Sequence, residues 1–280
     1  PRIPQGMGLV SLGDMLASRM GAAIHDSIEK AWLTNHRQAM EAIGLPKKVI
    51  DLVRINPKKE ELTEGTIPVY LEQRLSRKLG EWTVTGKFDF VAEGRVQDFK
   101  STTTFTYKNQ TNADKYIQQG SIYRWLDPDL ITQDEMDIHY IFTDWKAAMA
   151  KTDPKYPPRR FHRQSFPLLS LAETQRFIDS KLNLIERHWN SDEADLPPCT
   201  DDELWRSEPV FKYYANPEKT ARSTKNFATQ AEAMVKFVQD GSKGLVKEVP
   251  GQVVACKYCP AFAACTQKDQ LIASGDLLMG

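Results

Sequence analysis

The segment GKFDFVAEGRVQDFK, residues 86–100, alternates apolar and polar side chains on both sides of a short turn at residues 92–94. This pattern predicts a β-hairpin, because successive side chains in a strand point to opposite faces. Asp98 and Lys100 are two positions apart and therefore share one face of the second strand. Asp89 lies on the first strand. The segment thus places two carboxylates and one amine on a single hairpin.

The flanking sequence predicts further helices and strands. Apolar residues at helical spacing predict a long helix over residues 12–42, which Gly21 could break, whereas residues 45–64 are rich in charges and turn formers and predict a loop or short helix. The other expected elements are strands at 69–79, 82–94 and 95–105, a helix at 113–126, a strand at 136–143, and helices at 171–189 and 228–239. The order helix, three strands, helix, strand predicts an α/β core.

Composition excludes a strongly basic domain. Lys+Arg and Asp+Glu both count 37 in 280 residues, so only local patches could contact nucleic acid. No apolar run approaches the roughly 18 residues of a membrane span, and the N-terminus lacks a secretion signal. We therefore expect no membrane partner and a cytoplasmic location. The chain begins at Pro1 instead of Met, so residues upstream could be missing.

The carboxylates and the lysine suit phosphodiester hydrolysis. A divalent ion held by Asp89 and Asp98 would neutralise phosphate charge and generate hydroxide near neutral pH. Mg²⁺ fits such a site because it binds one or two carboxylates, several waters and the substrate phosphate. Lys100 could then orient or deprotonate the attacking water. The alternative is structural: Asp98 and Lys100 form an ion pair, and Asp89 caps a turn.

These motifs resemble the PD-(D/E)XK nuclease superfamily. GKFD at residues 86–89 and DFK at 98–100 resemble its central motif, with a glycine-led segment in place of the nominal Pro-Asp. GAAIH at 21–25 and QGSIY at 119–123 resemble two further motifs of the RecB-type branch. The resemblance implies a restriction-endonuclease-like core at residues 1–150, in which a mixed central β-sheet is flanked by helices.

The resemblance also assigns roles to residues. The implied metal ligands are His25, Asp89, Asp98 and the carbonyl oxygen of Phe99. The implied catalytic residues are Asp89, Asp98, Lys100, Gln119 and Tyr123. Because imidazole suits Mn²⁺ better than Mg²⁺, we expect the site to accept either ion. Gln119 and Tyr123, one helical turn apart, would contact DNA phosphates or hold the lysine. Glu72, on the preceding strand, could approach the site.

Cysteines cluster near the C-terminus. Cys256, Cys259 and Cys265 form a C-x2-C-x5-C pattern, which indicates a zinc site or an iron–sulfur cluster, whereas free thiols are the alternative. Cys199 is the remaining cysteine and could supply a fourth ligand.

The C-x2-C-x5-C pattern resembles that of iron–sulfur nucleases in helicase–nuclease and CRISPR adaptation systems, and of phage-encoded relatives. It implies a [4Fe–4S] cluster, with Zn²⁺ as the alternative, that pins a helical and loop extension at residues 151–280 to the core as one unit. Those relatives usually take the fourth cysteine from upstream of the nuclease motifs, but Cys199 lies downstream. The fourth ligand is therefore Cys199, a residue of another type, or a residue preceding Pro1.

Together these observations predict a Mg²⁺- or Mn²⁺-dependent deoxyribonuclease. The resemblance implies an exonuclease or end-processing enzyme that acts on single-stranded DNA or free ends in recombination, repair or phage replication, in the cytoplasm of a bacterial or phage-infected cell. No Walker motif is present, so a helicase or recombination protein would be a separate partner. The alternatives are an inactive DNA-binding or scaffold module and a restriction-type endonuclease. Candidates for stacking on bases or contacting phosphates are Tyr107, Lys108, Trp125 and residues 159–163.

Overall fold

The computed structural model describes residues 15–279, which form two compact units. The N-terminal unit comprises Met15–Asn183, and the C-terminal unit comprises the described residues from Leu184 onward. The division lies at residue 183 instead of the residue 150 expected from the sequence, because the strand that follows residue 150 pairs within the first unit. The start of the predicted first helix, residues 12–14, lies outside the described residues.

The N-terminal unit is built on a mixed six-stranded sheet in the order β1-β2-β5-β6-β7-β8, with β3 and β4 forming a separate hairpin. The strands are β1 Val53–Ile55, β2 Ile67–Leu71, β3 Arg74–Leu79, β4 Trp82–Lys87, β5 Phe90–Ala92, β6 Arg95–Thr102, β7 Glu135–Phe142 and β8 Phe161–Pro167. The pairs β1–β2 and β6–β7 are parallel, whereas the other neighbours are antiparallel.

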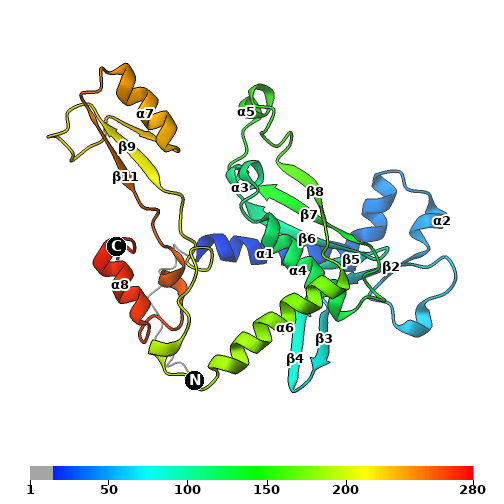
Figure 1. Ribbon diagram of the computed structural model, residues 1–280. Coiled ribbons are helices and arrows are strands. Elements are labelled where there is room, and N and C mark those ends of the chain that lie inside the picture. Colours follow the sequence, from blue (N-terminus) through cyan, green and yellow to red (C-terminus); the bar gives the residue numbers. More distant parts are fainter. Residues whose placement is uncertain (1–14, 280) are drawn as a thin grey trace. The chain divides into compact units, whose positions relative to one another are not determined.

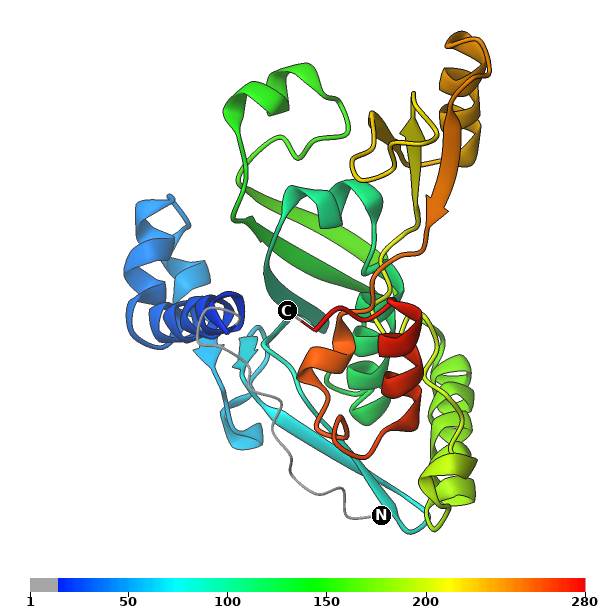
Figure 2. The ribbon, with the colours of Figure 1, turned by 90° about the vertical axis from the view of Figure 1, so that its left-hand side faces the viewer.

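Helices cover both faces of this sheet (Figure 1). They are α1 Leu16–Ala42, α2 Lys47–Ile50, α3 Thr104–Asn109, α4 Ala113–Leu126, α5 Ala147–Thr152 and α6 Leu171–His188, with a 3-10 turn at Lys59–Glu61. On β6, Val96 packs in one core with Trp125 of α4, and Phe99 packs in another with Trp32 of α1. Residues 96 and 99 lie on opposite faces of the strand, so α4 and α1 lie on opposite sides of the sheet (Figure 2).

The N-terminal unit therefore has the predicted mixed α/β fold, with a mixed central sheet flanked by helices. The core on the α4 side includes the fully buried Ile138, Tyr140 and Phe142 of β7. Burial of each such side chain contributes about 1.5–3 kcal/mol to folding. None of the helices within residues 15–279 is long and apolar enough to cross a bilayer.

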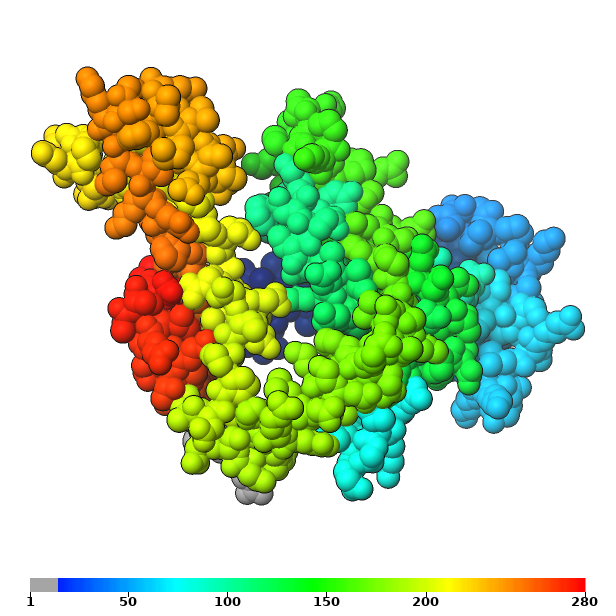
Figure 3. Space-filling model, viewed as in Figure 1, coloured from blue at the N-terminus to red at the C-terminus, as the bar shows by residue number. Residues whose placement is uncertain are grey.

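The first two predicted strands each divide in two, into β2 and β3 and into β4 and β5. The first break follows Glu72, whose φ of 54° is left-handed. Two backbone hydrogen bonds join the junctions, from Glu72 N to Asp89 O at 2.9 Å and from Phe88 N to Gln73 O at 3.1 Å. The β3–β4 hairpin consequently projects from the unit (cyan, Figure 3). We call the junction, at residues 72–73 and 88–89, the fork.

The C-terminal unit contains a three-stranded antiparallel sheet, in the order β10-β9-β11, that the sequence did not predict. Its elements are β9 Val210–Tyr214, β10 Lys225–Phe227, α7 Gln230–Gln239, β11 Leu245–Val249 and α8 Thr266–Ser274, with 3-10 turns at Glu193–Asp195 and Ala255–Tyr258. α7 packs on the sheet, where the Tyr213 hydroxyl donates to Asp240 Oδ2 at 2.9 Å. A separate small core lies beneath the cysteines and comprises Leu204, Val253, Cys256, Leu271 and Leu277.

Candidate metal centre

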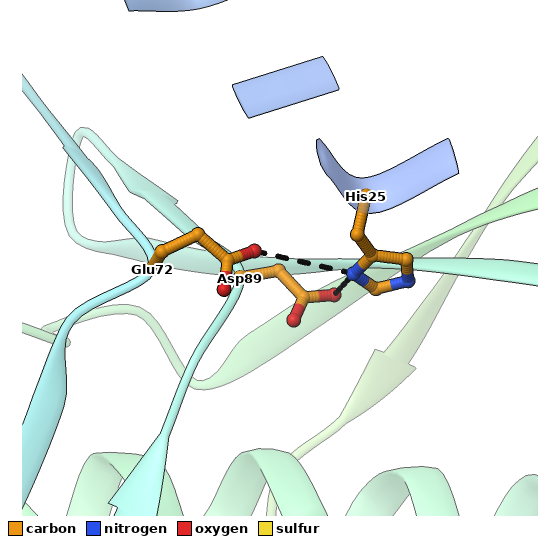
Figure 4. Close-up of side chains that lie close together, drawn as sticks. All are labelled: His25, Glu72 and Asp89. Carbon is orange, nitrogen blue, oxygen red and sulfur yellow. Dashed lines mark ion pairs between the residues drawn. The ribbon is translucent and has the colours of Figure 1, made fainter. Parts of the chain in front are cut away.

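Three side chains able to bind a cation converge at the fork. His25 comes from α1, which runs unbroken through Gly21, Glu72 follows β2, and Asp89 precedes β5. Their ligand atoms all lie within 4.8 Å of one another (Figure 4). His25 Nδ1 is 3.2 Å from Asp89 Oδ2 and 4.0 Å from Glu72 Oε1. These side chains help to line a pocket of about 10 Å³, which is roughly the space one water-sized sphere needs.

Both ring nitrogens of His25 face acceptor atoms. Nε2 lies 2.7 Å from the carbonyl oxygen of Phe99 on β6, and Nδ1 faces Asp89. Carbonyl and carboxylate oxygens only accept hydrogen bonds, so His25 carries a proton on each nitrogen when both bonds are made. The hydrogen bond to Asp89 raises the pKa of His25 and outweighs the opposing effect of burial. The protonated His25 ring therefore lies between oxygen acceptors. A position surrounded by such acceptors would also suit a metal cation.

Asp98 is buried beside this group on β6, with 1% of its surface exposed. Burial raises the pKa of Asp98 to about 6, although Lys100 partly opposes the shift. Lys100 Nζ forms an ion pair with Asp98 Oδ2 at 2.7 Å, which is the contact expected from the structural alternative.

The pKa of Asp89 is shifted in the opposite direction, downward. Burial favours a higher pKa for Asp89, but the hydrogen bonds from His25 and from the backbone N–H of Phe99 outweigh it, and the pKa is lowered. The N–H of Phe99 donates to Asp89 Oδ2 at 3.2 Å. Asp89 is therefore a carboxylate at neutral pH, and the two carboxyl groups, half-buried Asp89 and buried Asp98, differ in how tightly they hold a proton. A divalent cation fits this set, because it would be bound by carboxylate oxygens, imidazole and a carbonyl oxygen.

Lys100 is a half-buried cation. Burial would lower its pKa, but the carboxylate of Asp98 outweighs burial and raises it. Its ammonium group also lies 5.8 Å from the ring centroid of Tyr116 on α4. At neutral pH Lys100 is therefore protonated, and it can donate hydrogen bonds and stabilise negative charge.

Gln119 and Tyr123 support the site from α4. Gln119 Nε2 donates to Asp98 Oδ1 at 3.2 Å and to the Tyr123 hydroxyl at 2.9 Å, and that hydroxyl donates to the carbonyl oxygen of Lys87 at 2.7 Å. These bonds hold the two strands that carry Asp89 and Asp98 at a fixed separation. These contacts hold Asp98 and the backbone of Lys87, a positioning role that differs from the expected hold on Lys100.

Gly86 explains why a glycine leads the GKFD segment. A Cβ atom at this position would lie 2.9 Å from the ring of Tyr123, closer than packed side chains allow. The glycine lets the Tyr123 ring pass beneath β4, so that its hydroxyl reaches Lys87. The hairpin motif and the α4 motif are thus one packing unit.

The predicted metal ligands all lie in the N-terminal unit, but of the predicted ligand side chains only His25 and Asp89 belong to the three-residue group at the fork, and Asp98 does not. The structure also adds Lys87, whose Nζ lies 2.5 Å from Glu72 Oε2 and which the sequence analysis did not consider. The position of Glu72 at the fork agrees with its expected approach to the site. Lys87 could have been found from its place beside Asp89, since a lysine at a carboxylate cluster usually pairs with one of its members.

Of the residues proposed for contacts with DNA, Trp125 is buried and Tyr107 is half-buried, whereas Phe161 and Arg163 are exposed. Trp125 is 1% exposed and donates from its indole to Gln175, so its assignment as a stacking residue was wrong. Tyr107 packs edge-on against Tyr140, and its hydroxyl forms a hydrogen bond with the His162 ring. The helical spacing of this region identified helix α4 but not which aromatic side chains point inward. Among the basic candidates, Lys108 Nζ pairs with Asp153 at 2.5 Å and Arg163 lies 3.8 Å from Asp137.

The four cysteines gather in the C-terminal unit. Burial raises the pKa of the Cys256 thiol, and Cys265, Cys259 and Cys199 add to the shift, so all four lie within electrostatic reach. No disulfide joins them. Within residues 15–279, no three cysteine sulfurs lie within 4.8 Å of one another.

The loop that carries Cys199 is fastened to α8. The Cys199 N–H donates to Gln267 Oε1 at 2.8 Å, and Gln267 Nε2 donates back to the Cys199 carbonyl at 2.9 Å. Two hydrogen bonds between one side chain and one backbone residue fix both the distance and the orientation of the loop. The fourth cysteine is thereby held beside the C-terminal three by contacts that need no metal.

Comparison with known proteins leaves the family open. The sequence matches no family model and no curated protein. One solved structure that it resembles is described as "Crystal structure of SSO0001", with a TM-score of 0.34 and 13% sequence identity. The match covers 60% of this chain and 61% of that chain, so the chain spans less than two thirds of this neighbour. A likeness at that level supports no inference about function.

Proposed function

We propose that the chain is a metal-dependent deoxyribonuclease of the RecB-type PD-(D/E)XK branch, with a restriction-endonuclease-like core. The observation that carries the proposal is the convergence of His25, Glu72 and Asp89 at the fork, with the Phe99 carbonyl and Asp98 on the adjacent strand β6. His25 and Phe99 are 74 positions apart in the sequence yet only 2.7 Å apart at Nε2 and O. If the short motifs matched the family only by chance, there would be no reason for these groups to lie close together in the fold.

The proposed chemistry is hydrolysis of a phosphodiester. Bound Mg²⁺ or Mn²⁺ would neutralise phosphate charge and lower the pKa of a water molecule. His25, Asp89, Asp98 and the Phe99 carbonyl would hold the ion, and His25 must first give up a proton. Lys100 is protonated, so its part is to orient the attacking water and stabilise charge on the phosphate, rather than to remove a proton.

Gln119 and Tyr123 act through other groups. Gln119 holds Asp98, and Tyr123 holds the strand that leads to Asp89, so both are positioning residues in this proposal. We propose single-stranded DNA or free DNA ends as the substrate, in keeping with the RecB-type motifs, and a separate helicase or recombination protein as a possible partner.

The test is cleavage of end-labelled single- and double-stranded DNA with Mg²⁺, Mn²⁺ or EDTA. Wild-type protein should cut with either ion and not with EDTA, and Asp98→Asn or Lys100→Met should abolish cutting. The matched control is Asp137→Asn, because Asp137 is also a buried carboxylate, on the neighbouring strand and outside the site. Metal-dependent cutting by Lys100→Met at the wild-type rate would refute the catalytic assignment, and DNA binding without cutting by wild type would favour an inactive binding module.

We further propose that Cys199, Cys256, Cys259 and Cys265 hold a structural [4Fe–4S] cluster, with zinc as the alternative. The small core beneath the cysteines supports a cross-link, since compact folds with few buried apolar residues usually depend on disulfides or metals. A tetrahedral zinc site, with Zn–S distances of about 2.3 Å, would bring the sulfurs to within roughly 4 Å of one another.

A further inference from the structure

The β9-β10-β11 sheet of the C-terminal unit presents one face to α7 and the other away from it. The Tyr213 hydroxyl bonds to Asp240, the residue that caps the end of α7, so Tyr213 points toward the helix. Because side chains alternate along a strand, the neighbouring Lys212 points to the opposite face. We call this opposite side of the sheet the open face; Tyr214, on the same side, is buried, so the exposed part considered is the row at Lys212.

A row of hydrogen-bond donors crosses the open face. Lys212 on β9 pairs in register with Asn226 on β10 and with Lys247 on β11. Residues paired in register share a face of the sheet, so the three side chains lie side by side. Asn226 and Lys247 are exposed, and Lys212 is partly exposed.

Two lysines directly opposite each other repel, and such a pair destabilises a sheet. The acidic residue of β11, Glu248, pairs with Phe211 and therefore lies on the α7 face. No ion pair of Lys212 or Lys247 with an acidic side chain occurs among residues 15–279. By contrast Lys236, on α7, is neutralised by Asp240 at 2.7 Å. The open face is thus a local positive charge that the fold leaves uncompensated.

We propose that the open face binds the phosphate backbone of DNA through Lys212, Lys247 and Asn226. The row has the donors for adjacent phosphates, and phosphate contacts need no particular base sequence. The identity of the anion rests on the proposed nuclease function, whereas the charge complementarity comes from the register of the sheet. The C-terminal unit then adds a second DNA contact, remote in sequence from the metal ligands, that raises affinity without taking part in the chemistry.

The experiment measures the Kd of the full chain for a labelled single-stranded oligonucleotide in EDTA, by fluorescence anisotropy, over a range of salt concentrations. The variant Lys212→Gln with Lys247→Gln should bind about tenfold more weakly at low salt, and its slope of log K against log salt should be smaller by about 1.4. Its melting temperature should be unchanged or higher, because the substitutions remove a repulsion.

The matched control is Lys225→Gln with Lys236→Gln, which removes the same charge from the α7 side. Lys225 lies 5.0 Å over the Phe227 ring and Lys236 pairs with Asp240. This control should keep the wild-type Kd and salt slope, and an equal loss in both variants would reduce the effect to net charge and overturn the proposal. So would a wild-type Kd in the open-face variant.

The readouts separate this proposal from that of the nuclease. Hydrolysis of a small diester, bis(p-nitrophenyl) phosphate, depends on the metal centre alone, so the open-face variant should hydrolyse it at the wild-type rate. Failure of the nuclease proposal would appear as no Asp98-dependent hydrolysis in any variant. Failure of the open-face proposal would appear as unchanged DNA affinity, whatever the result of the hydrolysis assay.

Discussion

The Tyr123 hydroxyl donates to the carbonyl oxygen of Lys87 at 2.7 Å, and through this bond α4 supports the strand that leads to Asp89. The same hydroxyl accepts from Gln119, which also donates to Asp98. One chain of hydrogen bonds therefore connects both carboxylate strands to a single helix. Networks of this kind fix the separation of groups that must bind one ion.

Tyr123→Phe should therefore reduce catalysis more than folding. Loss of the buried hydrogen bond should cost about 1 kcal/mol of stability. Because ligands held less firmly bind metal and substrate in poorer geometry, kcat should fall about tenfold while KM for DNA changes little. Tyr140→Phe is the control, since Tyr140 is buried in the same core without contacting the carboxylates. Equal kcat values for Tyr123→Phe and Tyr140→Phe would show that the network is only structural.

Acid should weaken metal binding. The pKa of His25 is raised by its hydrogen bond to Asp89, and that of Asp98 is raised to about 6 by burial. Both groups must lose a proton to act as ligands, so the affinity for Mn²⁺ should fall by up to about tenfold per displaced proton for each pH unit below their pKa values. Calorimetric titration in buffers with different heats of ionisation counts the protons released. Release of no proton at pH 6 would contradict both assignments.

The same shifts set how metal-free stability varies with pH. His25 contributes stability below its ordinary pKa of 6.5, and this is lost as pH rises through the raised folded value. Asp98 also holds its proton more tightly when folded, so its contribution is lost as pH rises from 3.8 to about 6. The lowered pKa of Asp89 affects stability only at pH values below 3.8. The metal-free protein should thus lose stability as pH rises, and the gain in melting temperature on adding Mn²⁺ should grow.

Thermal melts with and without Mn²⁺ from about pH 5 to pH 8 check this sign, and each tenfold gain in affinity should add about 1.4 kcal/mol. His25→Ala should flatten the dependence. His36→Ala is the matched control, because His36 lies on the same helix and bonds only to the Trp32 carbonyl in the structure. A metal-induced gain that shrinks with rising pH would overturn the argument.

Glu72→Gln should weaken Mn²⁺ binding about tenfold, because Glu72 is one of the three groups within ligand distance at the fork and its neutral amide attracts a cation less. Glu29→Gln is the control, since Glu29 lines the same pocket from α1 but is not part of the three-residue group. Its affinity should stay within about twofold of wild type. If the two variants bind Mn²⁺ equally well, Glu72 serves only to hold Lys87.

Sequence alone located the central hairpin and helix α4 because their patterns are local. The alternation around residues 92–94 and the spacing of apolar residues in 113–126 each identify an element without knowledge of its neighbours. The fork is different. Apolar and polar side chains keep alternating through residues 72–73 and 88–89, so the sequence shows no break there. The strands break because Glu72 has a left-handed backbone and because hydrogen bonds join the two junctions, and no local pattern encodes either feature.

The candidate site was predicted better than the surface around it. His25, Asp98 and Lys100 were identified from motif order, and the structure places them in one unit. Trp125 was misassigned because helical spacing marks a buried side only when the direction of the core is known, and here Trp125 points into it. The strands β9–β11 were missed because lysines interrupt their apolar pattern, and those lysines make the open face.

Cys199→Ser should remove iron from the protein and destabilise the C-terminal unit. Cys199 is held beside the other three cysteines by two hydrogen bonds with Gln267, and burial followed by the nearby Glu203 raises the pKa of its thiol in the metal-free state. Binding to iron would keep the sulfur as a thiolate, so the metal offsets this unfavourable ionisation and stabilises the fold. Anaerobically purified wild type should be brown and contain iron. Cys199→Ser should be nearly colourless, with a melting temperature lower by several degrees, on the order of 2–4 °C per kcal/mol lost.

Gln267→Ala distinguishes the role of the Cys199 thiol as a ligand from that of the hydrogen bonds that hold its loop. This variant loosens the loop but keeps all four thiols, so it should retain iron while melting slightly below wild type. Cys259→Ser should lose iron as fully as Cys199→Ser, because a four-thiolate site fails when any ligand is lost. Zinc in place of iron in colourless wild-type protein would select the zinc alternative, and absence of both metals would refute the cluster. Wild-type iron content in Cys199→Ser, with iron lost only in Cys259→Ser, would show that the fourth ligand is another residue, despite the clamp that holds Cys199 in place.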